Sequence, residues 1–365
     1  MIYNIIIGQD SLVTKSLSKF LKNKIIFSSN QLSIENIKEI KSYKKINLIF
    51  NNFYPSKLLN DLTYRNYGNF EKLSIRILAN ILENIEPRKI NKIIYTSSAS
   101  IYRLLENIDN QKVDYFNRDI YSSFKLSSEK IILNYCLKNK VDYFIFRLFN
   151  TYGNSKDKFS FIEKIIKLKK ENNYLKLINN GNSIRDFIHV NDVGKIYDLI
   201  TQKKIKSGIY DLGTGKGYLI NDIIKSIKFP KSKIININNI NEIHNSIAKN
   251  RNLKKLLNSF KFKSLSEYLN NKLNLKIKNL KPILNFENEI RFNGPTGVVI
   301  YGAGNAGRQI YYELLKNKEK VLFFVDDKLK LQNTNLNGVP IINLENLLNL
   351  RKNYSIKRVY LAIPS

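Results

Sequence analysis

The chain has 365 residues, 43% of them hydrophobic, which is enough for about two domains with substantial cores. A single cysteine, Cys136, excludes an intrachain disulfide, and no apolar run is long enough for a membrane-spanning helix. The net charge of +31 comes from lysines spread along the whole chain, which argues against nucleic-acid binding as the main role. The first residues lack the pattern of a secretory signal, so we expect a cytoplasmic protein without membrane insertion.

The first 150 residues alternate short apolar runs with amphipathic stretches. Segments 70–85 and 121–137 have the spacing of helices. The apolar runs that we predict as strands are Tyr3–Ile7, Lys24–Phe27, Ile46–Phe50, Lys92–Thr96 and Tyr143–Leu148. Strands separated by helices predict an α/β fold, a doubly wound parallel sheet of Rossmann type with its ligand cleft at the carboxyl ends of the strands.

Beyond residue 151 the pattern is looser. The elements that we predict there are one strand and two helices, at 175–178, 159–170 and 190–201. Residues 273–296 have no clear period and contain Pro282, which predicts a linker. A new strand, loop and helix follow, so residues 297–365 are expected to form a second, short Rossmann-like α/β unit with about four strands.

A tyrosine and a lysine stand four residues apart in the segment YSSFK. On a helix, Tyr121 and Lys125 share one face, and an ammonium group beside a phenol lowers the pKa of the phenol. Such a tyrosine can take the proton of a sugar hydroxyl while a hydride leaves the same carbon. Ser98 lies at the end of the preceding strand, where its hydroxyl can bond the same sugar oxygen and relay the proton. The pair alone is weak evidence, because a solvated helix face can carry it by chance.

Six motifs follow one another within residues 1–272. They are IIIG at the start, YTSSASIY, YSSFK, RLFNTYGN, IRDFIHVNDV and GIYDLGTGKGYLIND. Together they resemble the extended short-chain dehydrogenases/reductases, the NAD-dependent nucleotide-sugar epimerases and dehydratases. The resemblance implies a cofactor part in about 1–150 and a smaller C-terminal substrate lobe interleaved in 151–272. It makes Ser98, Tyr121 and Lys125 the catalytic residues and implies a homodimer by analogy.

The resemblance also implies an NAD site. The residues expected to hold the cofactor are Gly8, Ser11, Leu12, Val13, Asn51, Thr96, Tyr121 and Lys125. Ser11 and Thr14 stand where the family has glycine, which allows close approach to pyrophosphate and close packing of helix on strand. Thr14 is bulkier and is expected to push its helix outward, while Asn51 either bonds the cofactor or caps a loop. No carboxylate follows the second strand, so NADP stays open as the alternative cofactor.

Two further residues fall on motif positions that line the family's substrate pocket. Asn150 is one, and Arg185 is expected to face the diphosphate of a nucleotide-diphosphate sugar. A guanidinium suits a diphosphate because its fork is planar and permanently charged. The alternative for Arg185 is a surface ion pair with Asp186.

The same motifs narrow the reaction. Family dehydratases carry an Asp-Glu pair where this chain has Ala99 and Ser100, and elimination needs those carboxylates. The resemblance therefore favours a C4 epimerase, with a keto-sugar reductase as the next alternative. A non-catalytic NAD(P)-sensing or scaffolding relative is the third alternative. The altered cofactor loop and the appended second unit argue for it, and the complete set of Ser98, Tyr121 and Lys125 argues against it.

The segment GAGNAG follows the first strand of the second unit. It is an intact GxGxxG, which predicts a nucleotide site on Gly302, Gly304 and Gly307, with Asp326 or Asp327 on the ribose. This unit resembles the leading domain of bacterial polysaccharide-biosynthesis nucleotide-sugar dehydratases, which implies a role in surface-polysaccharide precursor synthesis. The alternative is a packing unit with an empty loop.

No metal site is expected, because no cluster of His, Cys and carboxylates has the spacing of metal ligands. The histidines are His189 and His244. His189 lies in the apolar segment FIHV and is expected to be a packed core residue, as is Cys136.

Overall fold

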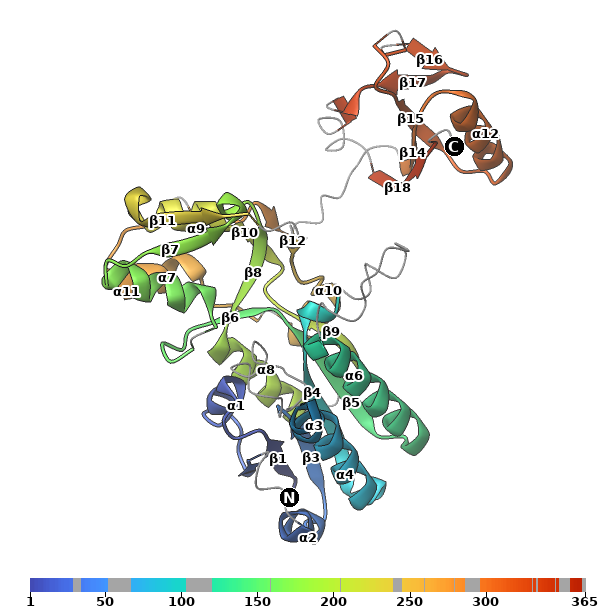
Figure 1. Cartoon of the computed structure of the whole chain (residues 1–365). Helices are drawn as coiled ribbons and strands as arrows, with labels where there is room; N and C mark the ends of the chain where they lie inside the picture. Colours follow the sequence, from blue (N-terminus) through green and yellow to red (C-terminus); the bar gives the residue numbers. More distant parts are fainter. Residues whose placement is uncertain are drawn as a thin grey trace. The chain divides into compact units, whose positions relative to one another are not determined.

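The chain folds into two units in a computed structural model (Figure 1). The units are Met1–Glu287 and Asn288–Ser365, and each is described by itself. The residues that the structure describes are 1–28, 34–51, 67–102, 120–157, 159–203, 205–238, 245–258, 260–278, 280–285, 296–329, 331–332, 334–344, 346–347 and 355–362.

A six-stranded sheet is the base of the first unit (Figure 1). All its strands run parallel, in the order β2-β1-β3-β4-β5-β9. Their bounds are β1 Tyr3–Ile7, β2 Lys24–Phe27, β3 Ile46–Phe50, β4 Ile90–Ser98, β5 Asp142–Leu148 and β9 Gly208–Leu212. The five runs predicted as strands are confirmed, and β4 and β5 are longer than their apolar runs.

The strand order locates the ligand crevice. β2 and β3 lie on opposite sides of β1, so the direction of winding reverses between them. At such a switch point the loops after neighbouring strands diverge and leave a crevice at the carboxyl edge. Here the crevice lies beyond Ile7 and Phe50, the last residues of β1 and β3. The predicted doubly wound α/β fold is confirmed.

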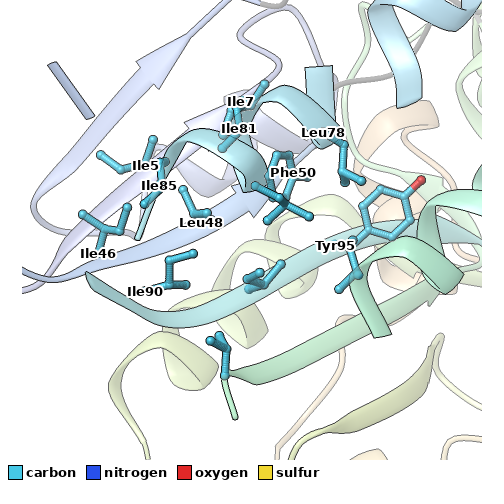
Figure 2. Packing of buried hydrophobic residues seen from close by; sticks show 14 of the residues in the cluster. Ile5, Ile7, Ile46, Leu48, Phe50, Leu78, Ile81, Ile85, Ile90 and Tyr95 are labelled. Carbon is cyan, nitrogen blue, oxygen red and sulfur yellow. The ribbon is translucent and has the colours of Figure 1, made fainter. Parts of the chain in front are cut away.

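Helices cover both faces of this sheet because successive strand residues point to opposite sides. Ile5 and Ile7 pack into one core and Ile6 into the other. The first core, drawn in Figure 2, lies under α2 (Ile34–Ser42), α4 (Ile77–Asn84) and α6 (Ile120–Asn139). The second lies under α1 (Leu12–Leu17), α8 (Val190–Gln202) and α10 (Arg251–Leu257). A short helix, α3 (Tyr67–Glu71), and a π-helical turn, η3 (Lys72–Arg76), lead into α4.

An asparagine ladder joins three strands near their amino ends. Asn47 on β3 donates its amide to Asn4 Oδ1 on β1 at 2.8 Å and accepts from Asn91 Nδ2 on β4 at 2.8 Å. Asn4 in turn donates to the Lys22 carbonyl at 2.8 Å. Asn4 and Asn47 are buried, 7% and 2% exposed, and stand in register on β1 and β3. The ladder thus satisfies polar groups inside the core and favours one strand register.

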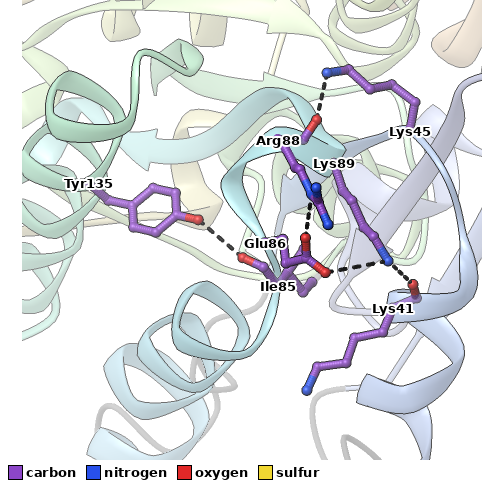
Figure 3. A network of polar contacts seen from close by, with 7 residues as sticks. All are labelled: Lys41, Lys45, Ile85, Glu86, Arg88, Lys89 and Tyr135. Atoms are coloured by element: carbon purple, nitrogen blue, oxygen red, sulfur yellow. Dashed lines mark hydrogen bonds and ion pairs between the residues drawn. The ribbon is translucent and has the colours of Figure 1, made fainter.

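Polar contacts tie the turn before β4 to its neighbours (Figure 3). This turn is η4 (Pro87–Lys89). The contacts are Lys89 Nζ to the Lys41 carbonyl at 2.7 Å, Lys45 Nζ to the Arg88 carbonyl at 2.8 Å and Tyr135 hydroxyl to the Ile85 carbonyl at 3.3 Å. They link the turn to α2, the loop before β3 and α6. The pair of Arg88 with Glu86 is exposed and contributes little to stability.

A smaller lobe follows the sheet and has its own core. Its strands are β6 Asn150–Tyr152, β7 Leu175–Ile178, β8 Ile184–His189, β10 Lys216–Leu219, β11 Ile234–Ile237, β12 Asn245–Ser246 and β13 Leu284–Asn285. Its helices are α7 Phe161–Lys170, α9 Ile220–Ser226 and α11 Leu265–Leu273, with short turns η6 Asn179–Gly181 and η7 Lys231–Lys233. The strand predicted at 175–178 is β7, and the helices predicted at 159–170 and 190–201 are α7 and α8, so these predictions are confirmed. β13 pairs with β10 inside the segment 273–296 that we expected to be a linker.

The second unit is a sheet of five strands in the order β16-β17-β15-β14-β18. The bounds are β14 Thr296–Tyr301, β15 Val321–Val325, β16 Thr334–Leu336, β17 Val339–Ile342, β18 Ser355–Leu361 and, for the helix after β14, α12 Asn305–Lys316. About four strands were expected, and the additional one is β16, which is antiparallel to β17. Asn337 and Gly338 form the two-residue turn between them, both with positive φ. Among all the described helices, none is long and apolar enough to cross a membrane.

Candidate active site

A cavity of about 350 Å³ lies at the carboxyl edge of the large sheet. The predicted site residues that line it are Ser11, Val13, Asn51, Thr96, Ser98, Tyr121, Lys125 and Asn150. The rest of the described wall consists of Ser97, Leu148, Phe149, Thr151, Asp157, Phe159, Ser160 and Phe161. Gly8, Leu12 and Arg185, which were also predicted, are not part of that wall. The structure therefore brings most of the predicted site together at the switch point of the sheet.

The three predicted catalytic residues come from two elements. Ser98 is the last residue of β4 and caps the short turn η5 (Ala99–Ile101), while Tyr121 and Lys125 lie one turn apart on α6. The Lys125 Nζ is 5.7 Å from the centre of the Tyr121 ring and donates to the Thr96 carbonyl at 2.5 Å. The spacing that put tyrosine and lysine on one helix face thus also puts both at the cavity.

Burial governs the charge of Lys125. Its side chain is 3% exposed, and desolvation lowers its pKa to about 7, against an opposing influence of Glu129. Glu129 lies one turn further along α6 and accepts from Arg147 Nε at 3.2 Å and Nη2 at 2.9 Å. The sequence led us to expect an ammonium group beside the phenol. With a pKa of about 7, the protonation of this amine near neutral pH depends on neighbouring charges such as Glu129.

Thr14, at the third glycine position of the cofactor loop, is buried and has a polar partner. It is 1% exposed, and its hydroxyl accepts from Asn51 Nδ2 at 3.0 Å. Asn51 Oδ1 accepts from the Thr96 hydroxyl, whose oxygen lies 2.6 Å from the Tyr197 hydroxyl on α8. Asn51 therefore bonds two protein side chains beside the cavity. This amide gives the hydroxyl of residue 14 a hydrogen-bond partner inside the core.

The first glycine of the loop keeps the conformation that requires glycine. Gly8 has φ of +110° directly after β1, and its N–H donates to the Phe27 carbonyl at 2.9 Å. Ser11 follows at the cavity wall, half-buried, and Leu12 begins α1. The loop therefore turns as the family pattern requires, although its second and third glycines are replaced.

Asn150 and Arg185 take different places. Asn150 lines the cavity and donates its amide to the Asp186 carbonyl at 2.9 Å. Arg185 lies half-buried on β8, where its Nη1 donates to the Ile184 carbonyl at 3.0 Å. Both side chains therefore bond backbone carbonyls of β8, but only Asn150 lines the cavity.

The alternative of a surface ion pair between Arg185 and Asp186 is wrong. Asp186 is 0% exposed, because successive residues of β8 face opposite sides. Its carboxylate accepts from Thr214 N at 3.0 Å, Thr214 Oγ1 at 2.6 Å, Gly215 N at 2.8 Å and Ala248 N at 3.2 Å. Burial raises the pKa of Asp186, and these hydrogen bonds oppose the rise. Asp186 therefore joins β8 to the segments around residues 214 and 248 by hydrogen bonds and does not pair with Arg185.

His189 is a packed core residue, as expected. It is 5% exposed, its Nδ1 accepts from Asn191 N at 3.0 Å, and burial lowers its pKa to about 4. A Cβ on Gly153 would come within 2.5 Å of its ring, which explains the glycine in RLFNTYGN. Cys136 is buried too, and His244 lies outside the described residues. The described ranges contain no group of three or more His, Cys, Asp or Glu side chains that could hold a metal.

Sequence reasoning missed part of the cavity wall. The aromatic side chains Phe149, Phe159 and Phe161 line it, and Tyr197 completes the polar contacts of Thr96. No local pattern marks these residues, because they reach the site from the lobe and from the opposite helix layer. Glu129 could have been found, since it stands four residues after Lys125 on the same predicted helix.

The second unit carries its glycine loop between β14 and α12. Gly302 has φ of +105°, and a Cβ on Gly307 would lie 2.0 Å from the Gly302 carbonyl, so both positions require glycine. A Cβ on Gly304 would meet no atom within 4 Å. Asp326 accepts from Ala303 N at 2.8 Å, so its carboxylate holds the loop itself. Asp327 accepts from the Tyr301 hydroxyl at 2.9 Å.

The fold and the site agree with a comparison of the sequence with known families. Residues 16–213, more than half of the chain, match the model of the NAD dependent epimerase/dehydratase family. The chain belongs to this family. The match begins just after the loop in which Ser11 and Thr14 replace glycine. The two glycine replacements in the loop therefore lie outside the matched residues.

Individual relatives cover the chain only in part. The dTDP-D-glucose 4,6-dehydratase of Dictyostelium discoideum is 25% identical over 220 residues, 55% of this chain and 49% of that protein. The ADP-L-glycero-D-manno-heptose-6-epimerase of Brachyspira hyodysenteriae is 29% identical over 157 residues, 41% of this chain and 49% of that protein. The chain thus spans about half the length of these relatives.

A solved structure of the same fold covers more. The UDP-glucuronic acid 4-epimerase from Bacillus cereus, in complex with UDP-glucuronic acid and NAD, has a TM-score of 0.60 to this chain at 18% identity. The similarity covers 75% of this chain and 98% of that chain. At this identity the likeness establishes the Rossmann-type fold and not the substrate.

Members of this NAD-dependent family bind NAD(P), and the residues present fit such a cofactor. The cavity lies at the switch point, Gly8 keeps the turn after β1, and the buried amine of Lys125 faces the site from α6. Ser11 and Val13 border the cavity on the loop side. These are the places at which a dinucleotide is held in a doubly wound sheet.

Proposed function

We propose that this chain is an NAD-dependent epimerase of a nucleotide-diphosphate sugar and acts at C4 of the sugar. The observation that supports the proposal most is the convergence of Ser98, Tyr121 and Lys125 on one cavity at the switch point of the sheet. These three residue types can remove and return the proton of a sugar hydroxyl.

In this proposal the three side chains have different roles. Tyr121 takes the proton of the C4 hydroxyl and later returns one to the same oxygen. Lys125, when protonated, favours the phenolate form of Tyr121 and holds the nicotinamide ribose. Ser98 bonds the C4 oxygen throughout. NAD, when bound, would supply the hydride acceptor and donor that a change of configuration at C4 requires.

The remaining predicted residues divide between cofactor and sugar. We assign the dinucleotide to Gly8, Ser11, Leu12, Val13, Asn51 and Thr96. Asn150, at the cavity wall, is assigned to the sugar. Arg185 is assigned to the diphosphate, because its planar fork can bond two phosphate oxygens together. The setting that we propose is surface-polysaccharide precursor synthesis, with the protein acting as a homodimer.

The structure offers no acid and base for a dehydratase at the corresponding positions. Ala99 and Ser100 form the turn after Ser98, where elimination would need two carboxylates. A keto-sugar reductase is the second candidate. It is favoured by the lack of an acidic residue at Ser28, directly after β2, because a carboxylate there would bond the adenosine ribose. A cofactor held less tightly suits a reaction in which it must leave after each turnover.

The test uses the full chain, NAD and a panel of UDP-sugars. We expect one sugar to be converted to its C4 epimer without net reduction of NAD, as measured by chromatography of the products. Tyr121→Phe should lower turnover at least about 100-fold, since general acid–base groups contribute 10²–10⁴. The affinity for NAD, measured by calorimetry, should not change. Stoichiometric consumption of NADH would identify the reductase, and NAD binding without any sugar chemistry would identify the sensing relative.

We also propose that the second unit binds a nucleotide at Gly302, Gly304, Gly307 and Asp326. The support is geometric: Gly304 leaves open space at the start of α12, and the loop is held in shape by Asp326. Open space at the second glycine of such a loop lets a pyrophosphate approach the backbone closely.

A further inference from the structure

Three serine hydroxyls form a chain of hydrogen bonds that ends at Ser98. Ser122, on α6, donates its hydroxyl to Ser100 Oγ at 2.6 Å. Ser100 donates its own hydroxyl to Ser98 Oγ at 2.9 Å and its backbone N–H to the same oxygen at 3.2 Å. Ser122 is 0% exposed, so the chain runs from the interior of the unit to the cavity that Ser98 lines.

This arrangement decides what Ser98 can do. A hydroxyl oxygen has two lone pairs and one hydrogen. The backbone N–H of Ser100 can only donate, so it occupies one lone pair of Ser98, and the Ser100 hydroxyl occupies the other. Ser98 therefore has no lone pair left for a hydrogen of the sugar, and its own hydrogen is what it offers to the cavity.

We propose that Ser100 and Ser122 are positioning residues that hold Ser98 as a hydrogen-bond donor toward the reacting sugar oxygen. The proposal rests on the proposed function of the site. A fixed donor is useful there because the sugar oxygen gains negative charge as its proton leaves and becomes a carbonyl oxygen as the hydride leaves. A donor stabilises both states better than the starting hydroxyl.

Ser98 and Tyr121 therefore have separate roles in this proposal: Ser98 donates a hydrogen bond and Tyr121 takes the proton. Since Ser98 cannot accept the hydrogen of the sugar hydroxyl, it does not relay the proton. The proton passes directly from the sugar oxygen to the Tyr121 oxygen, and the O–H bond that breaks on the sugar is replaced by the one that forms on the phenol. Ser100 thus stands at a family dehydratase's carboxylate position and serves a different purpose, orienting the neighbouring hydroxyl.

The kinetic test is a double-mutant cycle on the sugar that the UDP-sugar panel identifies. Ser100→Ala should lower kcat about tenfold and leave KM nearly unchanged, while Ser100→Thr, which keeps the hydroxyl, should restore kcat. In a Ser98→Ala background, Ser100→Ala should have no further effect, because Ser100 acts through Ser98. Ser123→Ala, one residue along α6 from Ser122, is the matched control and should behave as the unmutated chain. An equal loss in both backgrounds would overturn the proposal.

A second measurement does not depend on the substrate. Neutron diffraction from crystals of the deuterated full chain locates hydroxyl deuterons directly. We expect the Ser98 deuteron to point into the cavity and the Ser100 deuteron to lie on the line to Ser98 Oγ. A Ser98 deuteron directed at Ser100 Oγ would refute the donor assignment. If no UDP-sugar reacts, the proposed function fails, and the deuteron positions still decide the present proposal on its own terms.

Discussion

At the scale of single residues, a side chain proposed to act in the reaction can lower the stability of the fold, and Lys125 is the clearest case. Its amine is 3% exposed, and burial lowers its pKa to about 7. The amine of the unfolded chain keeps its proton up to its ordinary pKa of 10.5. Folding at neutral pH must therefore either bury a charge or release a proton, and both cost free energy.

Lys125→Met should stabilise the NAD-free protein. The gain in unfolding free energy should be about 2 kcal/mol at pH 7, because about 1.4 kcal/mol for each unit of pKa shift exceeds the lost hydrogen bond to the Thr96 carbonyl. Above pH 10.5 the amine is neutral in the folded and in the unfolded protein. The gain in unfolding free energy is therefore full below pH 7 and falls to zero as the pH rises from 7 to 10.5. Urea unfolding at pH 7 and at about pH 10 measures it. A gain independent of pH would show that packing, and not the amine, is responsible.

Replacing Thr14 by the family's glycine should lower the free energy of unfolding. Thr14→Gly removes the acceptor of Asn51 Nδ2. A buried amide without its partner costs about 1–3 kcal/mol. We therefore expect a lower free energy of unfolding and no tighter binding of NAD, measured by calorimetry, while Thr14→Ser keeps both at their original values. Tighter NAD binding by Thr14→Gly would mean that Asn51 does not compensate for the lost glycine.

At the scale of elements, the sequence predicted the strands well because each contains a short, uninterrupted apolar run. Tyr3–Ile7, Lys24–Phe27 and Ile46–Phe50 have the predicted bounds. β4 extends to Ser98 because hydrogen bonding to β5 continues past the apolar residues. Strand order depends on which strands pair across the chain, and no local pattern contains it.

The asparagine ladder should contribute to the stability of the large sheet. Asn47→Val leaves Asn4 Oδ1 and Asn91 Nδ2 without their hydrogen-bond partner. We expect a loss of about 2 kcal/mol, measured by urea unfolding. The double variant Asn4→Val with Asn47→Val should lose less than the sum of the single losses, since it also removes Asn4 Oδ1, the acceptor that Asn47→Val alone leaves unpaired. Additive losses would show that the two amides do not act as a pair.

At the scale of the whole molecule, the chain has two glycine loops in two units, one altered and one intact. Each loop follows the first strand of the large sheet in its unit and precedes a helix. The intact one lies in the smaller unit, outside the part of the chain that matches the family model.

Calorimetric titration of the full chain with NAD should separate the two loops. We expect two binding events per chain. Gly304→Val should abolish one of them without unfolding the unit, because its Cβ would meet no atom within 4 Å and its φ is −78°. Circular dichroism of the variant provides the check on folding. A single event that Gly304→Val leaves intact would assign the nucleotide to the first unit alone. Two events that both survive Gly304→Val would show that the glycine loop of the second unit is not the second site.

The sequence by itself determined the α/β class and the positions of β1 to β5, and it predicted the set of Ser98, Tyr121 and Lys125, because each depends on local spacing along the chain. Tyr121 and Lys125 share a face whenever their segment is helical. Only the tertiary structure decided that Thr14 bonds Asn51, that Asp186 is buried away from Arg185, and that Ser122 and Ser100 direct the hydroxyl of Ser98. These are contacts between residues distant in sequence or on opposite faces of an element. Their partners are set by strand order and burial, which arise only when the whole sheet has formed.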